Sequence, residues 1–157
     1  MEHELVSESL EDTLAIGARL GAVVLAGDFI ALEGPLGAGK SRLAEGIARG
    51  LGIPEDERIP SPTFTIVNEH PARLLLVHAD FYRLDSPEEL DEIGWRDYAR
   101  RDCVFVVEWV SRIRERAPDD RLTVELTPRG GDRRTILLSS SGPRSEQLLL
   151  ALAAPAD

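Results

Sequence analysis

The chain is poor in lysine and cysteine and has no long apolar run. Arginine accounts for 17 of its 18 basic residues, so Lys40 is the single lysine, and Cys103 is the single cysteine. One cysteine excludes an intrachain disulfide and a cysteine metal cluster, which indicates a reducing compartment. The longest apolar stretches, such as residues 148–154, are too short to cross a membrane, and the acidic N-terminus does not resemble a signal peptide. We therefore expect a cytoplasmic protein that does not enter the membrane.

Positive charge is scarce as well. The 157 residues include 28 acidic and 18 basic side chains, which gives a net charge of −10. A chain this acidic lacks the positive surface that attracts nucleic acid without sequence preference. No repeat or low-complexity segment divides the sequence, and its length suits one domain. We therefore expect a single globular domain over residues 1–157.

The apolar pattern predicts alternating helices and strands, which is typical of the α/β class. The expected helices run from a capping Ser9 to a turn at Asp28, over residues 39–51, and around residues 148–152. The expected strands lie at residues 29–33, 64–67, 74–77 and 103–107, with a β-hairpin formed by residues 121–127 and 134–139 around Gly130-Gly131.

Two segments contain residues that stop or start helices. Residues 52–63 are polar and carry three prolines, so we expect an exposed, mobile loop. Residues 86–89 read Ser-Pro-Glu-Glu, a capping box with proline at the first helical position. The pattern predicts a short acidic helix that Ser86 caps.

Residues 34–41 read Gly-Pro-Leu-Gly-Ala-Gly-Lys-Ser and match the phosphate-loop pattern G-x-x-x-x-G-K-[ST] at every constrained position. Glycines let consecutive backbone N–H groups converge on a phosphate, and the helix that follows adds its positive N-terminal end. Lys40 is expected to reach the β- and γ-phosphates of a nucleotide, and the Ser41 hydroxyl to hold Mg²⁺. The residues of this segment expected to bind the nucleotide are Gly34, Gly37, Ala38, Gly39, Lys40, Ser41 and Arg42.

The alternative is a glycine-rich turn in which Gly-Lys-Ser occurs by chance. Two observations favour the phosphate loop. A predicted buried strand precedes the segment and a predicted helix follows it, which is the context that this motif requires. The chain also uses arginine for every other positive side chain and keeps lysine where a compact ammonium fits among phosphates.

Two predicted strands are followed by an acid, Asp80 after residues 74–79 and Glu108 after residues 104–107. The carboxyl ends of neighbouring parallel strands are where such sheets bind ligands. Either carboxylate could therefore be the Walker B residue that holds Mg²⁺. The alternatives are a turn or cap role for Asp80 and a surface ion pair with Arg112 or Arg114 for Glu108.

Thr63 ends the proline-rich segment, directly before a predicted strand. It could be a switch threonine that approaches Mg²⁺ and the γ-phosphate, or a residue that only begins the strand in a rigid turn. Local sequence leaves the two interpretations equally open.

Several classes of phosphate-loop protein remain. A conventional GTPase is excluded, because its Asn-Lys-x-Asp element needs a second lysine that the chain does not have. The open classes are an ATPase that drives a partner, a small-molecule kinase, and a nucleotide-binding scaffold without turnover. A kinase needs an arginine-bearing lid. Arg96, Arg100 and Arg101 could form such a phosphate clamp, although charge on a helix surface is the commoner explanation.

Six short motifs occur in one order along most of the chain. They are residues 34–41, Ser-Pro-Thr-Phe-Thr at 61–65, His-x-Asp-x-Tyr-Arg-Leu at 78–84, Pro-Glu-Glu-Leu at 87–90, Gly-x-Arg-Asp-Tyr at 94–98 and Val-Glu-Trp at 107–109. This combination resembles the bacterial TsaE family, formerly YjeE. The resemblance implies a P-loop NTPase-like α/β fold, with a central mixed, mostly parallel sheet flanked by helices and a C-terminal β-hairpin.

The resemblance also implies a function. Members of this family are ATPases that join the TsaB–TsaD complex and support its transfer of a threonylcarbamoyl group to adenosine 37 of tRNA, the t⁶A modification. If TsaD holds the tRNA, this subunit needs no basic groove of its own. We therefore expect weak or no binding of tRNA by the isolated chain, in line with its acidic charge.

Roles for individual residues follow from the same resemblance. Lys40 and Ser41 would bind phosphate and Mg²⁺, and Thr63 would be the switch threonine. Asp80 would be the Walker B-like acid, and Glu108 a Mg²⁺ ligand or a residue that orients water. The last two implied site residues are Trp109, beside the nucleotide, and Arg134, after the hairpin turn. The family usually has threonine where this chain has Ser41, but the hydroxyl is retained.

Overall fold

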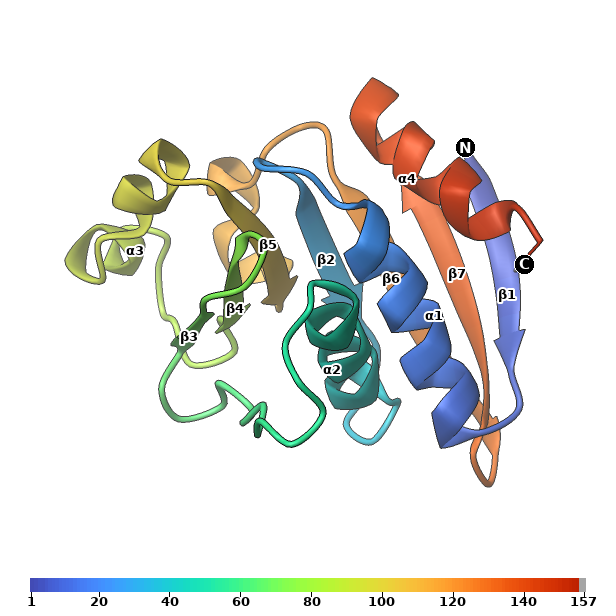
Figure 1. Ribbon diagram of the computed structural model, residues 1–157. Helices are drawn as coiled ribbons and strands as arrows, with labels where there is room; N and C mark the ends of the chain where they lie inside the picture. Colours follow the sequence, from blue (N-terminus) through green and yellow to red (C-terminus); the bar gives the residue numbers. More distant parts are fainter. Residues whose placement is uncertain (156–157) are drawn as a thin grey trace.

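The computed structural model describes residues 1–155. Its seven strands form one sheet in the order β1-β7-β6-β2-β5-β4-β3 (Figure 1). The strands are β1 Glu2–Ser7, β2 Phe29–Glu33, β3 Val67–His70, β4 Leu75–Asp80, β5 Cys103–Glu108, β6 Leu122–Gly130 and β7 Arg133–Ser140. The helices are α1 Leu10–Val23, α2 Lys40–Gly50, α3 Glu89–Glu92 and α4 Pro143–Ala153, with 3-10 helices η1 Trp95–Arg100 and η2 Val110–Arg116.

The middle of the sheet is parallel and its edges are antiparallel. Strands β6, β2, β5 and β4 pair in parallel, whereas β3 pairs with β4, β7 with β6 and β1 with β7 in antiparallel fashion. The predicted α/β class and the mixed sheet with a parallel centre are confirmed. The predicted hairpin is β6 and β7, which belong to this same sheet.

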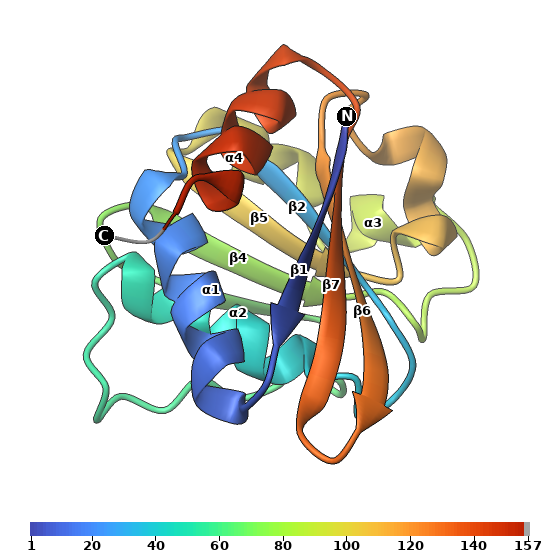
Figure 2. The ribbon, with the colours of Figure 1, turned by 90° about the vertical axis from the view of Figure 1, so that its right-hand side faces the viewer.

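Different helices cover the two faces of the sheet. Helices α1, α2 and α4 pack on one face over the larger core cluster, and α4 lies beside α1 and the β1–β7 edge (Figure 2). The short helices α3 and η2 contribute Leu90 and Ile113 to a smaller cluster on the other face, against which Trp95 of η1 packs. This second cluster lies over β2, β4 and β5.

Helices α1 and α2 approach each other closely at four glycines. Gly17 and Gly21 of α1 face Gly46 and Gly50 of α2, and a Cβ at any of the four would lie 2.1 to 2.5 Å from a carbonyl oxygen of the other helix. Only glycine fits at this separation. Because α2 follows the phosphate loop directly, this contact fixes the position of the loop's helix against the rest of the fold.

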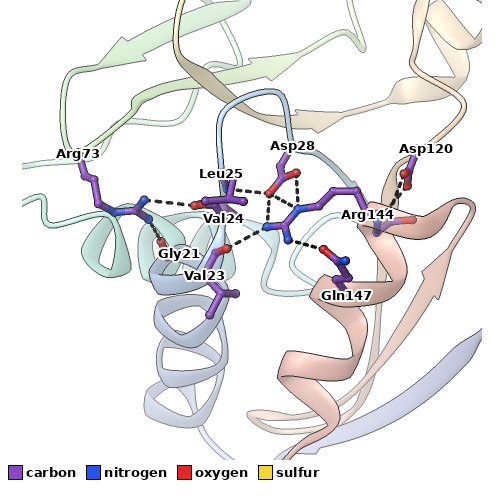
Figure 3. Close-up of polar contacts among 10 residues, drawn as sticks. Gly21, Val23, Val24, Leu25, Asp28, Arg73, Asp120, Arg144 and Gln147 are labelled. Carbon is purple, nitrogen blue, oxygen red and sulfur yellow. Dashed lines mark hydrogen bonds and ion pairs between the residues drawn. The ribbon is translucent and has the colours of Figure 1, made fainter.

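Both ends of α1 are held by side chains. Ser9 caps the first turn by accepting from the Asp12 amide, as predicted. At the other end, Arg73 donates to the Gly21 and Val24 carbonyls, and Arg144 of α4 donates to the Val23 carbonyl (Figure 3). Arg144 also forms a two-pronged ion pair with the buried Asp28, at 2.9 and 2.8 Å. Arginines far away in the sequence thus donate to the carbonyl groups at the C-terminal end of α1, whose own last turn contains no basic residue.

Three local predictions about the middle of the chain have different outcomes. The strand predicted at residues 64–67 is wrong, because Ile66 has a positive φ of 69° and its amide bonds to the Pro62 carbonyl in a turn. Strand β3 begins only at Val67, so Thr63 is not directly before a strand. Residues 52–63 form neither helix nor strand and are mostly exposed, as predicted, while their mobility stays a prediction.

The predicted capping box is also wrong in detail. Helix α3 begins at Glu89, and the Glu89 side chain accepts from the Asp85 amide instead of the Ser86 amide. The Glu89 amide in turn bonds to the Ser86 carbonyl. The segment therefore starts as a tight backbone turn, which does not need a serine side chain.

Strand β1 has no counterpart in the sequence prediction. Residues 2–7 form the antiparallel edge strand on β7, with Leu5 packed against the larger core and Glu2 and Glu4 exposed. The alternation of exposed and partly buried residues in this segment is weak in the sequence, because the glutamates make it look uniformly polar. Its role as a strand becomes clear only from its pairing with β7. Within residues 1–155, no helix combines the length and apolar character needed to cross a membrane.

Candidate phosphate-binding site

The phosphate loop connects β2 to α2 across the end of the parallel sheet. Gly34, Gly37 and Gly39 have positive φ angles of 147°, 81° and 104°, which side chains with a Cβ rarely adopt. No described side chain caps the first turn of α2. The free N–H groups and positive dipole end of α2 therefore face the loop, which suits a bound anion.

Ten of the twelve predicted site residues line one cavity of about 770 Å³ beside this loop. They come from the loop and α2, the segment before β3, the ends of β4 and β5, and β7. The ten are Gly37, Gly39, Lys40, Ser41, Arg42, Thr63, Asp80, Glu108, Trp109 and Arg134. Residues up to 97 positions apart in sequence thus meet around the loop.

The other two predicted residues do not face this cavity. Gly34 lines a neighbouring cavity of about 320 Å³, which Lys40 and Trp109 also border. The Ala38 side chain is 1% exposed and belongs to the hydrophobic core, and its amide donates to the Pro35 carbonyl within the loop. Ala38 therefore supports the loop from behind.

Lys40 lies where the two cavities meet. Its ammonium donates to the Gly34 carbonyl at 2.8 Å and lies 3.6 Å from Glu108 Oε1 and 5.7 Å from the centroid of the Trp109 ring. The side chain is largely buried. A buried ammonium needs such compensation, and these contacts keep its charge beside the loop.

Asp80 and Glu108 are direct cross-strand neighbours at the ends of β4 and β5. Both are buried. Burial, and to a lesser extent the neighbouring Glu108 carboxylate, raise the pKa of Asp80 above its ordinary value, against a hydrogen bond from the Tyr82 amide that lowers it. Asp80 therefore both closes a turn and faces the cavity. Two carboxylates side by side create a demand for positive charge, which one lysine only partly meets.

The surface ion pair considered for Glu108 is wrong. Its carboxylate faces inward, toward Lys40 and the buried His78. Arg112 lies over the ring of Tyr82 instead. Tyr82 in turn packs against Trp109, with 4.8 Å between the ring centroids, at the mouth of the cavity.

Arg134 lies on β7 with its guanidinium against the phosphate loop. A Cβ at Gly39 would lie 1.8 Å from Arg134 Nη1, so the arginine occupies the space that the glycine leaves. Arg134 is 5% exposed, and its Nε and Nη1 atoms are buried without a hydrogen-bond partner among the described residues. Since a buried cation with unmet donors is costly, the cavity favours an anion at this position.

Thr63 and the arginine cluster have different places. Thr63 is exposed on the cavity wall, with its hydroxyl 2.7 Å from that of Ser61. Arg96 instead pairs with Asp91 and Arg101 with Glu69, and neither lines the cavity. The surface interpretation of the arginine cluster therefore applies.

Sequence reasoning missed six residues that line the cavity. They are Leu10, Leu36, Ser61, Tyr82, Gly131 and Asp132. Leu36, Ser61 and Tyr82 fall within motifs that the sequence displays, but their direction toward the cavity depends on the tertiary structure. Leu10 reaches the site from the start of α1, and Gly131 and Asp132 reach it from the hairpin turn, which no local pattern connects.

The donor set suits magnesium better than a metal with its own protein cage. Residues 1–155 contain no group of three or more His, Cys, Asp or Glu side chains that could hold a metal ion. Ser41, Asp80 and Glu108 do offer oxygen atoms at the cavity. Mg²⁺ is usually held by one or two carboxylates together with substrate phosphates, so these residues fit it.

Comparison with known proteins identifies the family. The model of the family described as "Threonylcarbamoyl adenosine biosynthesis protein TsaE" matches residues 7–136. The chain belongs to the TsaE family. The TsaE protein of Bacillus subtilis is 39% identical over 139 residues, which cover 88% of this chain and 85% of that protein. That of Mycobacterium tuberculosis H37Rv is 42% identical over 127 residues, 74% of each chain.

The fold agrees with this TsaE assignment. The crystal structure of Bacillus subtilis YdiB superimposes with a TM-score of 0.80 at 36% sequence identity, covering 98% of this chain and 95% of that one. The family match also contains the phosphate loop, both acids and Arg134. The predicted family and fold are therefore confirmed.

Proposed function

We propose that this TsaE-family chain is an ATP-hydrolysing subunit of the t⁶A pathway. In this proposal it works with TsaB and TsaD and supports their transfer of a threonylcarbamoyl group to adenosine 37 of tRNA. Family membership supports the pathway. The site supports the nucleotide chemistry.

The buried guanidinium of Arg134 is the observation that carries the proposal. Its unmet donors lie against Gly39, inside a loop whose glycines and helix N-terminus already suit phosphate. Lys40 adds a second cation, whose ammonium donates to the Gly34 carbonyl of the loop. Two cations around a phosphate loop offset part of the negative charge of a nucleoside triphosphate, and Mg²⁺ would offset more of it when bound.

The acidic residues would serve the metal and the attacking water. Ser41, Asp80 and Glu108 would hold Mg²⁺, which neutralises charge on the phosphates when it is bound. Both carboxylates are buried away from bulk solvent, so their charge acts strongly at the cavity. Thr63 would close the site from the loop before β3 as a switch threonine.

Charge also supports the division of labour with partners. At a net charge of −10 the chain is poorly suited to hold tRNA, so the proposal gives that task to TsaD. In this proposal the chain supports t⁶A formation in the cytoplasm. Nanomolar binding of tRNA by the isolated chain at physiological salt would contradict this part of the proposal.

Reconstitution of the pathway tests the function. Purified TsaB and TsaD, tRNA and the threonylcarbamoyl donor are incubated with ATP, with and without this chain, and t⁶A and inorganic phosphate are both measured. We expect sustained t⁶A formation only with this chain, and ATP hydrolysis that the partners alter. ATP consumption that requires a small-molecule acceptor would instead indicate a kinase, and binding without hydrolysis would indicate a scaffold.

Substitution of Lys40 sharpens the same test. Lys40→Ala removes the ammonium from the loop, and we expect it to abolish ATP turnover and support of t⁶A formation while the circular dichroism spectrum stays unchanged. Arg100→Ala is the matched control, because it removes an exposed positive charge from η1, away from the cavity. Wild-type turnover in Lys40→Ala would refute the proposed function.

A further inference from the structure

His78 is a buried residue that the proposed chemistry leaves without a role. It is 3% exposed, lies on β4 two residues before Asp80, and does not line the cavity. Its Nε2 atom lies 3.3 Å from Glu108 Oε2. The other carboxylate oxygen, Oε1, lies 3.6 Å from the Lys40 ammonium. The two oxygens of Glu108 therefore face different groups.

The direction of the His78 hydrogen bond follows from its partner. A carboxylate oxygen accepts hydrogen bonds and does not donate them, so the proton between the two groups belongs to His78 Nε2. His78 Nδ1 is buried and has no hydrogen-bond partner among residues 1–155. The bond to Glu108 is thus the polar contact that the structure shows for this imidazole.

We propose that His78 is a positioning residue that holds Glu108 Oε2 and leaves Oε1 as the oxygen that acts at the phosphate site. The inference rests on the proposed function, in which Glu108 binds Mg²⁺ or orients water. A carboxylate without such a bond rotates easily about its terminal torsion and can bind a cation through both oxygens. The imidazole restricts both, because it fixes one oxygen on the buried side.

Neighbouring His70 shows what a histidine without this role looks like. It lies on β3, is also buried, and its Nε2 atom has no hydrogen-bond partner among the described residues. It does not contact Glu108. Substitution of His70 therefore removes a buried imidazole from the adjacent strand without touching the site, which makes it a matched control for His78.

Steady-state kinetics separate positioning from simple support of the fold. Removing a residue that orients a metal ligand typically costs about 10- to 100-fold in activity. We expect His78→Leu to lower kcat for ATP hydrolysis by about this factor, with little change in KM because the loop and Lys40 remain. His78→Gln keeps an N–H donor close to the position of Nε2 and should recover most of kcat. His70→Leu should leave both constants near wild type.

Nuclear magnetic resonance tests the hydrogen bond without any turnover. Two-bond ¹⁵N–¹H correlation of the wild-type imidazole should show the His78 proton on Nε2. A proton on Nδ1 alone would overturn the inference, as would wild-type kcat in His78→Leu or a loss that His78→Gln does not recover.

Failure of the proposed function would look different. If the wild-type chain with its partners does not hydrolyse ATP, the function is wrong, and the proton position on His78 still decides whether the imidazole holds Glu108. If wild type hydrolyses ATP and His78→Leu matches it, only the positioning role is wrong. The spectrum needs no variant, so a folding failure of His78→Leu does not affect it.

Discussion

Arg134→Met is expected to stabilise the unliganded protein while weakening its binding of nucleotide. The guanidinium is buried against Gly39, with Nε and Nη1 lacking partners among the described residues. Methionine keeps the length and apolar stem of the side chain and removes the charge. The substitution thus separates the cost of the buried cation from the packing of β7.

The magnitudes follow from these unmet donors. A buried polar group without a partner costs about 1–3 kcal/mol, so the free energy of unfolding of the unliganded variant should rise by roughly this amount. For a chain of this length, each kcal/mol corresponds to about 2–4 °C in Tm. Loss of a charged hydrogen bond to phosphate, about 1.5–3 kcal/mol, should weaken ATP binding roughly 10- to 150-fold.

Urea unfolding with and without Mg²⁺ and a non-hydrolysable ATP analogue measures both effects. At about 100 times the wild-type Kd, the ligand should add about 2.7 kcal/mol to wild-type stability. A variant that binds 100-fold more weakly should gain only about 0.4 kcal/mol. Arg133→Met is the control, because Arg133 directly precedes Arg134 on β7, is exposed and pairs with Glu8 at the surface. Arg133→Met should change the free energy of unfolding without ligand, and the gain in this energy on adding ligand, each by less than about 0.5 kcal/mol.

Two results would refute this reasoning. If Arg134→Met unfolds more easily than wild type without ligand, the guanidinium stabilises the fold and is not an uncompensated charge. If the ligand stabilises the variant as much as wild type, Arg134 does not bind the nucleotide. The nucleotide affinity of Arg134→Lys should lie between those of wild type and Arg134→Met, since lysine keeps the charge and loses the planar fork of donors.

Three further outcomes are expected from the rest of the structure. Arg144→Met removes the ion pair to the buried Asp28, which keeps the Leu25 amide as a donor, and it also removes the Arg144 donor to the Val23 carbonyl (Figure 3). Since Arg144 is partly exposed, we expect a loss of about 2–3 kcal/mol in urea unfolding, and a loss below about 1 kcal/mol would contradict this. Gly46→Ala places a Cβ 2.3 Å from the Leu14 carbonyl oxygen and should lower stability by about 1–3 kcal/mol, although alanine favours helices; a higher Tm would show that α1 and α2 can separate. Burial raises the pKa of Asp80 above 3.8, so the folded state holds this proton more tightly than the unfolded state. The free energy of unfolding therefore falls as the pH rises from the pKa of Asp80 in the unfolded state to its higher pKa in the folded state. Asp80→Asn should flatten that fall in unfolding measurements from about pH 4 to pH 7, and an unchanged slope would exclude Asp80 as its cause.

Local patterns predicted those parts of the fold that short-range physics dictates. Ser9 caps α1 because its side chain needs only the amide three residues ahead. The buried strands β2 and β5 are continuous apolar runs whose burial on both faces leaves little choice of structure. Where local signals compete, prediction failed: residues 64–67 favour a strand by composition, yet the Ile66 amide bonds to the Pro62 carbonyl in a turn.

The sequence by itself determined which residue types are available at the candidate site. The phosphate-loop pattern, the single lysine within it and two acids that follow apolar strands are all visible without coordinates, because each role needs one residue type at one spacing. Motif order alone was also enough to indicate the TsaE family, which the family comparison confirms.

Only the tertiary structure decided how these groups act on one another. Sheet order places Asp80 beside Glu108, and the return of β7 past the loop brings the Arg134 guanidinium against Gly39. The interlocked glycines of α1 and α2, and the separate partners of the two Glu108 oxygens, likewise join segments far apart along the chain. Such contacts depend on packing between distant segments, whose register no short stretch of sequence encodes.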